Sequence, residues 1–191
     1  MGLGDNFTSP TCPDFFRRFL ADDDFRQCFP LSLLLETSDA FFQASLPLLT
    51  QTLDASCNIS SPDRCSLLLA DLADHILLDS TCGPDAALGN PTVAAALAGF
   101  QAFEPLQRAA CLRNDTGDYC FADAATDRAR PSSNYVYFLA LGVPWPDSAP
   151  LPSCSSCLNR TLDIFHEYSG NHSQPLHRTL PPVADLADDA C

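Results

Sequence analysis

Cysteine placement constrains the fold of this chain more than any other feature of its sequence. Ten cysteines, an even number, are spread through the 191 residues, at Cys12, Cys28, Cys57, Cys65, Cys82, Cys111, Cys120, Cys154, Cys157 and Cys191. Five Asn-x-Ser/Thr glycosylation acceptors accompany them: Asn6, Asn58, Asn114, Asn159 and Asn171. Disulfides and N-glycans both form on the secretory route, so these features predict a secreted, extracellular, disulfide-stapled glycoprotein. The alternative is a cytosolic protein with free thiols, which explains neither feature.

Two short cysteine-bounded loops are candidates for local disulfides. Residues 57–65 and 111–120 each contain a sequon and polar turn residues. A Cys111–Cys120 bridge would restrain the unfolded chain by roughly 2.7 kcal/mol on the loop-entropy estimate. The other pairings cannot be derived from the sequence. We therefore predict local Cys57–Cys65 and Cys111–Cys120 bridges within a set of about five.

The Cys154-Ser-Ser-Cys157 motif has two interpretations. A Cys-x-x-Cys at a helix start can be a redox pair, because the helix N-terminus lowers the pKa of the first thiol. That chemistry usually needs a βαβ surround, which this sequence does not predict. We therefore expect structural disulfides here, either to each other or to distant partners. A zinc site would need a second pair at suitable spacing, and the sequence has none.

Apolar residues recur with helical periodicity through most of the chain. One such stripe is formed by Cys65, Leu68, Leu69, Leu72 and Ile76, and Asn90-Pro91 is a typical helix start. The segment 135–141 has strand-like residues, but a lone strand would have no partner, so we expect a helix there. The predicted helices cover 13–20, 38–55, 61–76, 92–112, 121–128, 135–141, 154–168 and 181–191, with another turn at 25–29 and a short Leu-rich segment at 31–35.

The predicted fold is a compact all-α domain of about seven to nine segments. Prolines such as Pro47 and Pro105 should kink the longer ones, and 92–112 can be one bent helix or two helices end to end. We expect an N-terminal extension at 1–11 and a single cysteine-rich domain at 12–191. The first residues have no signal-peptide character, so we expect that a signal peptide has been removed. The abrupt stop at Cys191 is typical of a domain boundary.

The net charge of the chain argues against several classes of binding partner. The chain has a net charge of −14, and all ten of its basic residues are Arg. Such a surface repels nucleic-acid phosphates and anionic lipid head groups, so we expect no nucleic-acid binding. No run of eighteen apolar residues occurs, so we expect no transmembrane segment.

No catalytic constellation is evident, and we predict no catalytic, cofactor-binding or metal-binding residue. The acidic run 22–24 lacks the alternating oxygens and closing Glu of an EF-hand and is interpreted as a solvated turn. Asp123 and Asp127 form a glycosidase-like pair in principle, but 24 acidic residues make such pairs inevitable. The histidines are isolated along the chain, at His75, His166, His172 and His177.

The cysteine framework resembles a known but uncharacterised family. The resemblance is carried by residues 107–112, Cys120 and residues 151–157, together with residues 24–28 and the Cys57 and Cys65 spacing. They are similar to secreted, cysteine-rich proteins of fungi, mostly basidiomycetes, which often continue into a Ser/Thr-rich stalk and a GPI-anchor signal. The resemblance implies a cell-surface or wall location and brings no established activity.

Three functional hypotheses follow. The leading one is a non-catalytic fungal cell-surface or wall-associated glycoprotein that binds an unknown surface or wall ligand. The second is an extracellular carrier of a lipid or another apolar small molecule. The third is a hydrolase of acidic media that uses Asp and His. Aromatic residues that would line the cavity of a carrier are Phe15, Phe16, Phe19, Phe41, Phe42, Phe100, Phe103 and Trp145.

Overall fold

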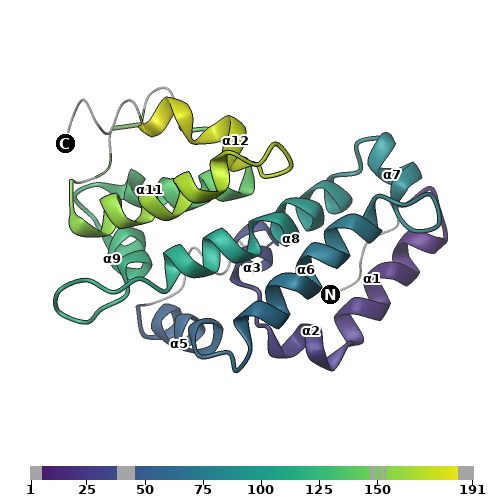
Figure 1. Cartoon of the computed structure of the whole chain (residues 1–191), viewed down its shortest axis with the longest axis horizontal. Helices are drawn as coiled ribbons and strands as arrows, with labels where there is room; N and C mark the ends of the chain where they lie inside the picture. Colours follow the sequence, from purple (N-terminus) through teal and green to yellow (C-terminus); the bar gives the residue numbers. More distant parts are fainter. Residues whose placement is uncertain (1–5, 38–45, 147–148, 151, 153, 185–191) are drawn as a thin grey trace.

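The structure is a computed structural model, and it describes residues 6–37, 46–146, 149–150, 152 and 154–184 of the chain. Over these residues the regular structure is helical, apart from one isolated β-bridge between Arg113 and Tyr119, which confirms the predicted all-α class (Figure 1). The elements are α1 Thr11–Ala21, α2 Asp23–Gln27, α3 Leu31–Thr37, α5 Leu46–Cys57, α6 Pro62–Ile76, α7 Gly83–Ala87, α8 Pro91–Ala110, α9 Cys120–Thr126, η1 Pro131–Asn134, α10 Tyr135–Phe138, η2 Leu139–Leu141, α11 Ser156–Ser169 and α12 Leu176–Thr179.

The 20-residue helix α8 is the spine of the molecule. It lies between α1, α2, α6 and α7 at one end and α9, α11 and α12 at the other (Figure 1). Asn90 caps it, because the Asn90 side chain accepts hydrogen bonds from the backbone N–H groups of Thr92 and Val93. The helix continues through Gly99 and Pro105, so the segment is one helix and not two.

Two clusters of buried apolar side chains share this spine. The first cluster joins α1, α2 and α6 to the first half of α8, and its centre is aromatic: the Phe19 ring lies 4.9 Å from Phe25 and 5.3 Å from Phe100, centroid to centroid. The second cluster joins α3, α5, α9, α10, η2, α11 and α12 to the second half of α8. Phe103 belongs to the first cluster and Leu106 to the second, so α8 contributes to both.

The described phenylalanines proposed for a carrier cavity pack against one another in this first cluster. Phe15, Phe16 and Phe19 meet edge to face or tilted, at centroid distances of 5.4–6.2 Å. Trp145 is only partly buried and contacts the Tyr135 ring at 6.0 Å. Phe41 and Phe42 lie outside the described residues.

Four disulfides have both cysteines in the described residues, two of them in the first cluster and two between elements of the second. Cys12–Cys82 and Cys28–Cys65 lie in the first, and Cys57–Cys111 and Cys120–Cys157 join elements of the second, at sequence separations of 70, 37, 54 and 37. Cys154 is also disulfide-bonded, and none of the cysteines in the described ranges has a free thiol. Cys191 lies outside those ranges.

The predicted local bridges Cys57–Cys65 and Cys111–Cys120 are therefore wrong. The 111–120 loop is closed by backbone hydrogen bonds instead, from Cys120 N–H to Leu112 O (2.9 Å) and from Asn114 N–H to Asp118 O (2.8 Å). Cys111 caps the C-terminus of α8, where it meets Cys57 at the end of α5. Helix packing, which sequence spacing does not reveal, selects these partners.

Most predicted helices are present, with shifted ends. Residues 135–141 are helical as predicted, as α10 and η2. Leu20, near the end of α1, is 47% exposed. Residues 38–45, the first part of the helix predicted over 38–55, lie outside the described residues, and Pro47 is the second residue of α5. Of the predicted 181–191 helix, residues 181–184 are helical and the rest lies outside the described part.

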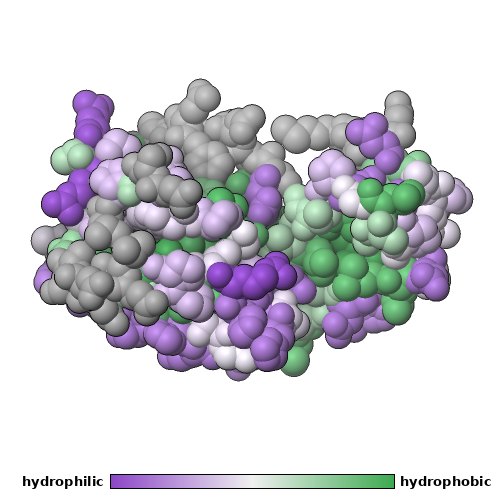
Figure 2. All heavy atoms as spheres, turned by 90° about the horizontal axis from the view of Figure 1, so that it is seen from above, coloured by the Kyte–Doolittle hydropathy of each residue, from purple (hydrophilic) through white to green (hydrophobic). Residues whose placement is uncertain are grey.

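The exterior carries a hydrophobic area away from the second cluster. Figure 2 shows hydrophobic side chains gathered toward the end of the molecule where α6 and α7 lie. Leu77, Leu78 and Leu88, in or beside the turns that follow α6 and α7, are exposed. Among the described helices, none is both long and apolar enough to cross a membrane.

Candidate functional site

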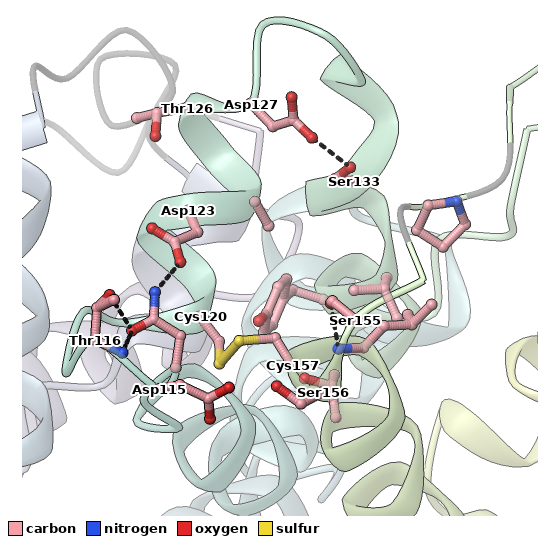
Figure 3. Close-up of a pocket in the computed structure, with 17 residues that line it drawn as sticks. Asp115, Thr116, Cys120, Asp123, Thr126, Asp127, Ser133, Ser155, Ser156 and Cys157 are labelled. Atoms are coloured by element: carbon pink, nitrogen blue, oxygen red, sulfur yellow. Dashed lines mark hydrogen bonds between the residues drawn. A yellow bond between two sulfur atoms is a disulfide. The ribbon is translucent and has the colours of Figure 1, made fainter. Parts of the chain in front are cut away.

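A polar cleft of about 600 Å³ lies beside the second cluster. Its walls come from the 111–120 loop, α9, η1 with α10, and the start of α11 (Figure 3). Among the described residues, three carboxylates line it, those of Asp115, Asp123 and Asp127, and no Arg or His does. Hydroxyl groups make up most of the remaining polar lining, from Thr116, Thr126, Ser133, Tyr137, Ser155, Ser156 and Thr161.

The 111–120 loop presents its polar residues to the cleft through a turn centred on Asn114. The Asn114 side-chain oxygen accepts hydrogen bonds from the backbone N–H groups of Thr116 (3.0 Å) and Asp118 (2.9 Å). Gly117 has a φ of 91°, a left-handed conformation that glycine adopts without steric cost. The Asn114 amide in turn donates to an Asp123 carboxylate oxygen at 2.5 Å, which ties the loop to α9.

Asp123 and Asp127 enter the cleft from α9. They are four residues apart, one helical turn, and Asp127 is the C-cap of that helix. One Asp127 oxygen accepts from the backbone N–H groups of Ala129 (2.9 Å) and Arg130 (3.0 Å), and the other from the Ser133 hydroxyl (3.3 Å). The structure thus brings the Asp123 and Asp127 pair of the sequence into one cleft.

The start of α11 forms the opposite wall. The Ser155 hydroxyl caps the helix by accepting a hydrogen bond from the Leu158 N–H at 3.1 Å. The Cys120–Cys157 disulfide joins α9 directly to α11, so it fixes the width of the cleft at this point (Figure 3). The Cys-x-x-Cys motif is therefore structural at Cys157, with a distant partner.

Tyr137 lies at the base of the cleft and is 2% exposed. Burial, reinforced by the nearby negative charge of Asp123, raises the pKa of Tyr137 to about 12. The phenol therefore stays protonated and remains a hydrogen-bond donor across the physiological pH range. Its polar neighbour is the fully buried Thr161 hydroxyl.

The histidines lie elsewhere. His75 contacts Asp71 within α6, with Nδ1 3.0 Å from a carboxylate oxygen. The rings of His172 and His177 lie side by side, 4.1 Å apart between centroids, and His166 is exposed on α11. In the described ranges, no group of three His, Cys, Asp or Glu side chains could hold a metal ion.

The sequons differ in their surroundings. Asn6, Asn58, Asn159 and Asn171 are exposed, with room for a glycan in solvent. Asn114 is half-buried at the edge of the cleft, and its amide already donates to Asp123. Glycan attachment at these sites remains a prediction.

Sequence reasoning did not predict the cleft. The Asp, Ser and Thr residues between 114 and 133 and the serines before α11 were a compositional signal of polar surface. Their proximity depends on the Cys120–Cys157 pairing and on the packing of α9 against η1, neither of which the sequence reveals.

A family model described as a domain of unknown function, DUF7729, matches residues 1–191. No curated protein and no solved structure matches the chain. The chemistry of the cleft must therefore be argued from the residues that form it.

Proposed function

Because this chain belongs to DUF7729, a family defined only as a domain of unknown function, we propose its function from its own structure. It is a secreted, non-catalytic surface or wall module that binds a hydroxyl-rich ligand, of the wall-polysaccharide type, in the polar cleft. The observation that carries this proposal is the cleft itself, in which ten carboxylate and hydroxyl side chains from separate segments converge around about 600 Å³.

The disulfides support the extracellular part of the proposal. Every cysteine within the described residues is oxidised, and the four disulfides with both cysteines in those residues span 37–70 residues. Reducing compartments do not maintain such a set. Four exposed sequons agree with passage through the secretory route.

The hydrogen-bonding inventory supports a carbohydrate ligand. Carboxylates accept hydrogen bonds from sugar hydroxyls, while Ser and Thr hydroxyls both donate and accept. Tyr137 adds a protonated donor at the base, and Val136 and Leu158 add apolar contact surface. An apolar ligand would cover these polar groups without giving them hydrogen-bond partners, which costs free energy.

A hydrolase is the second candidate, because Asp123 and Asp127 line the same cleft. Against it, both carboxylates already accept hydrogen bonds that hold the cleft walls in place, and no histidine in the described part of the chain lines the cleft. These contacts favour a structural role for the two residues in the wall of a binding site.

The test is retention on insoluble polysaccharides by protein made in a eukaryotic secretory host, with its disulfides intact. We expect the wild type to sediment with at least one wall polysaccharide and Ser156→Phe, which fills the cleft, to remain in solution. Ser169→Phe, at the other end of α11, is the matched control and should sediment normally. Absence of binding to every polysaccharide contradicts the proposal, and release of reducing sugars from a bound one would favour the hydrolase.

A further inference from the structure

The carboxylates of the cleft lack the cationic partners that five other acidic residues in the described part of the chain have. Asp14, Asp23, Asp24, Asp54 and Glu167 each lie within 4.0 Å of an arginine. By contrast, the three cleft carboxylates make no ion pair with any residue in the described ranges: Asp115, Asp123 and Asp127.

Arginines near the cleft are engaged with other groups. Arg113 donates to the Gly117 carbonyl at 2.7 Å, lies 3.7 Å from Asp54 and stacks over the Tyr119 ring. Arg130 donates to the Pro152 carbonyl and Arg160 to the Arg113 carbonyl. These three arginines therefore make no ion pair with the cleft carboxylates.

Two polar groups of the cleft also lack partners within the described part of the chain. Asp115 makes neither a hydrogen bond nor an ion pair through its side chain there, and it is exposed. Thr161 is fully buried in the cleft lining, and its hydroxyl makes no hydrogen bond of normal geometry with a described residue. The polar neighbour of the Thr161 hydroxyl is the Tyr137 phenol, which lines the same cleft.

We infer that the cleft selects a carbohydrate carrying protonated amino groups, of the glucosamine-oligomer class; this inference rests on the proposed function. Ammonium groups would pair with the cleft carboxylates through charge-assisted hydrogen bonds, and the sugar hydroxyls would meet the Ser, Thr and Tyr hydroxyls. Phosphorylated and acidic sugars would be repelled by the same charges, and by the net charge of −14.

Isothermal titration calorimetry with three probes tests separately whether binding requires positive charge on the ligand and whether it requires a carbohydrate. The probes are a glucosamine hexamer, an N-acetylglucosamine hexamer and the polyamine spermine, in mildly acidic buffer that keeps the amines protonated. We expect the glucosamine hexamer to bind about tenfold more tightly than the acetylated one, as two or three exposed charge pairs would give. Raising the salt concentration should reduce that difference.

The outcomes separate this inference from the proposed function. Equal affinity for the two hexamers overturns the charge selection and leaves the polysaccharide-binding proposal standing. Spermine binding as tightly as the glucosamine hexamer overturns the carbohydrate requirement. Failure of every carbohydrate, including the insoluble polysaccharides, overturns both.

Variants that remove one carboxylate charge test whether the preference for the glucosamine hexamer arises in the cleft. Asp115→Asn should raise the Kd for the glucosamine hexamer about two- to fivefold, the range for one exposed charge pair, and Asp115→Asn with Asp123→Asn about tenfold. Asp74→Asn on α6 removes the same charge outside the cleft and should leave the Kd unchanged. None of these substitutions creates a sequon. Equal weakening by Asp74→Asn would show a general charge effect and contradict the inference.

Discussion

Asp85 holds the described N-terminal residues against the body of the protein. It is 1% exposed and accepts hydrogen bonds from the Thr8 N–H (2.6 Å), the Thr8 hydroxyl (2.9 Å) and the Ser9 N–H (3.2 Å). Phe7 adds a ring contact to Phe16 at 5.7 Å. The described part of the predicted 1–11 extension is therefore attached to the first cluster.

The pKa of Asp85 makes this attachment sensitive to acid. Burial alone would raise the pKa, but the hydrogen bonds from Thr8 and Ser9 outweigh it and hold the pKa below the ordinary value of 3.8. A carboxylate with a lowered folded-state pKa stabilises the protein above its unfolded pKa, and that contribution is lost as the pH falls through the folded pKa. Asp85→Ala should lower the free energy of unfolding by about 2 kcal/mol at pH 6.

Urea unfolding at several pH values measures this contribution. The difference in free energy of unfolding between the wild type and Asp85→Ala should become smaller as the pH falls below about 4, because both proteins then lack the charged acceptor. Exposed Asp79→Ala is the control and should unfold like the wild type. A difference in free energy of unfolding that stays constant down to the lowest pH would contradict a stabilising role for the Asp85 negative charge.

Gly99 of α8 lies very close to the Leu33 side chain, a contact that the sequence did not indicate. A Cβ at this position would lie 2.4 Å from Leu33 Cδ2 and 3.1 Å from Leu33 Cγ. Alanine normally favours a helix over glycine by about 1 kcal/mol, while overpacking costs about 1–3 kcal/mol. Gly99→Ala should therefore destabilise the wild type but stabilise a Leu33→Ala variant. A double-mutant cycle by thermal unfolding measures the sign in each background, and stabilisation in both would contradict the clash.

At the scale of an element, the start of α8 depends on one side chain. Asn90 caps the helix through its oxygen, and its amide donates to the Asn6 carbonyl at 2.9 Å. Asn90→Ala should reduce the free energy of unfolding by about 1–2 kcal/mol. Asn90→Asp keeps the cap and loses only the donor, so it should fall between the wild type and Asn90→Ala in chemical denaturation. An Asp variant as unstable as the Ala variant would mean that the Asn6 contact, and not the cap, carries the effect.

Local patterns predicted the elements well and their contacts poorly. The 3.6-residue stripe of α6 and the Asn90-Pro91 start of α8 could be predicted because caps and periodicity are encoded within a few residues. The disulfide partners could not be predicted, because cysteines such as Cys120 and Cys157 lie 37 residues apart and meet only when α9 packs near α11. The cleft depends on the same packing, so its residues could be predicted as polar surface but not as one site.

At the scale of the whole molecule, the two clusters are each associated with a disulfide that closes a loop of the same length. Cys28–Cys65 and Cys120–Cys157 both close 37 residues, so each should stabilise the fold by about 4 kcal/mol through loop entropy. Only the second joins two walls of the polar cleft. We expect the double alanine variants to lose similar thermal stability, while only Cys120→Ala/Cys157→Ala loses carbohydrate binding below its unfolding temperature. Equal loss of binding in both would contradict a local role for this disulfide.

Hydrogen–deuterium exchange of the glycosylated protein, with and without the tightest-binding oligosaccharide, tests the central claim that the polar cleft is the ligand site. Bound sugar should slow amide exchange in residues 114–127 and 155–158 and leave α1 and α6 unchanged. Protection confined to the α6–α7 end, or binding without protection around the cleft, would contradict the account.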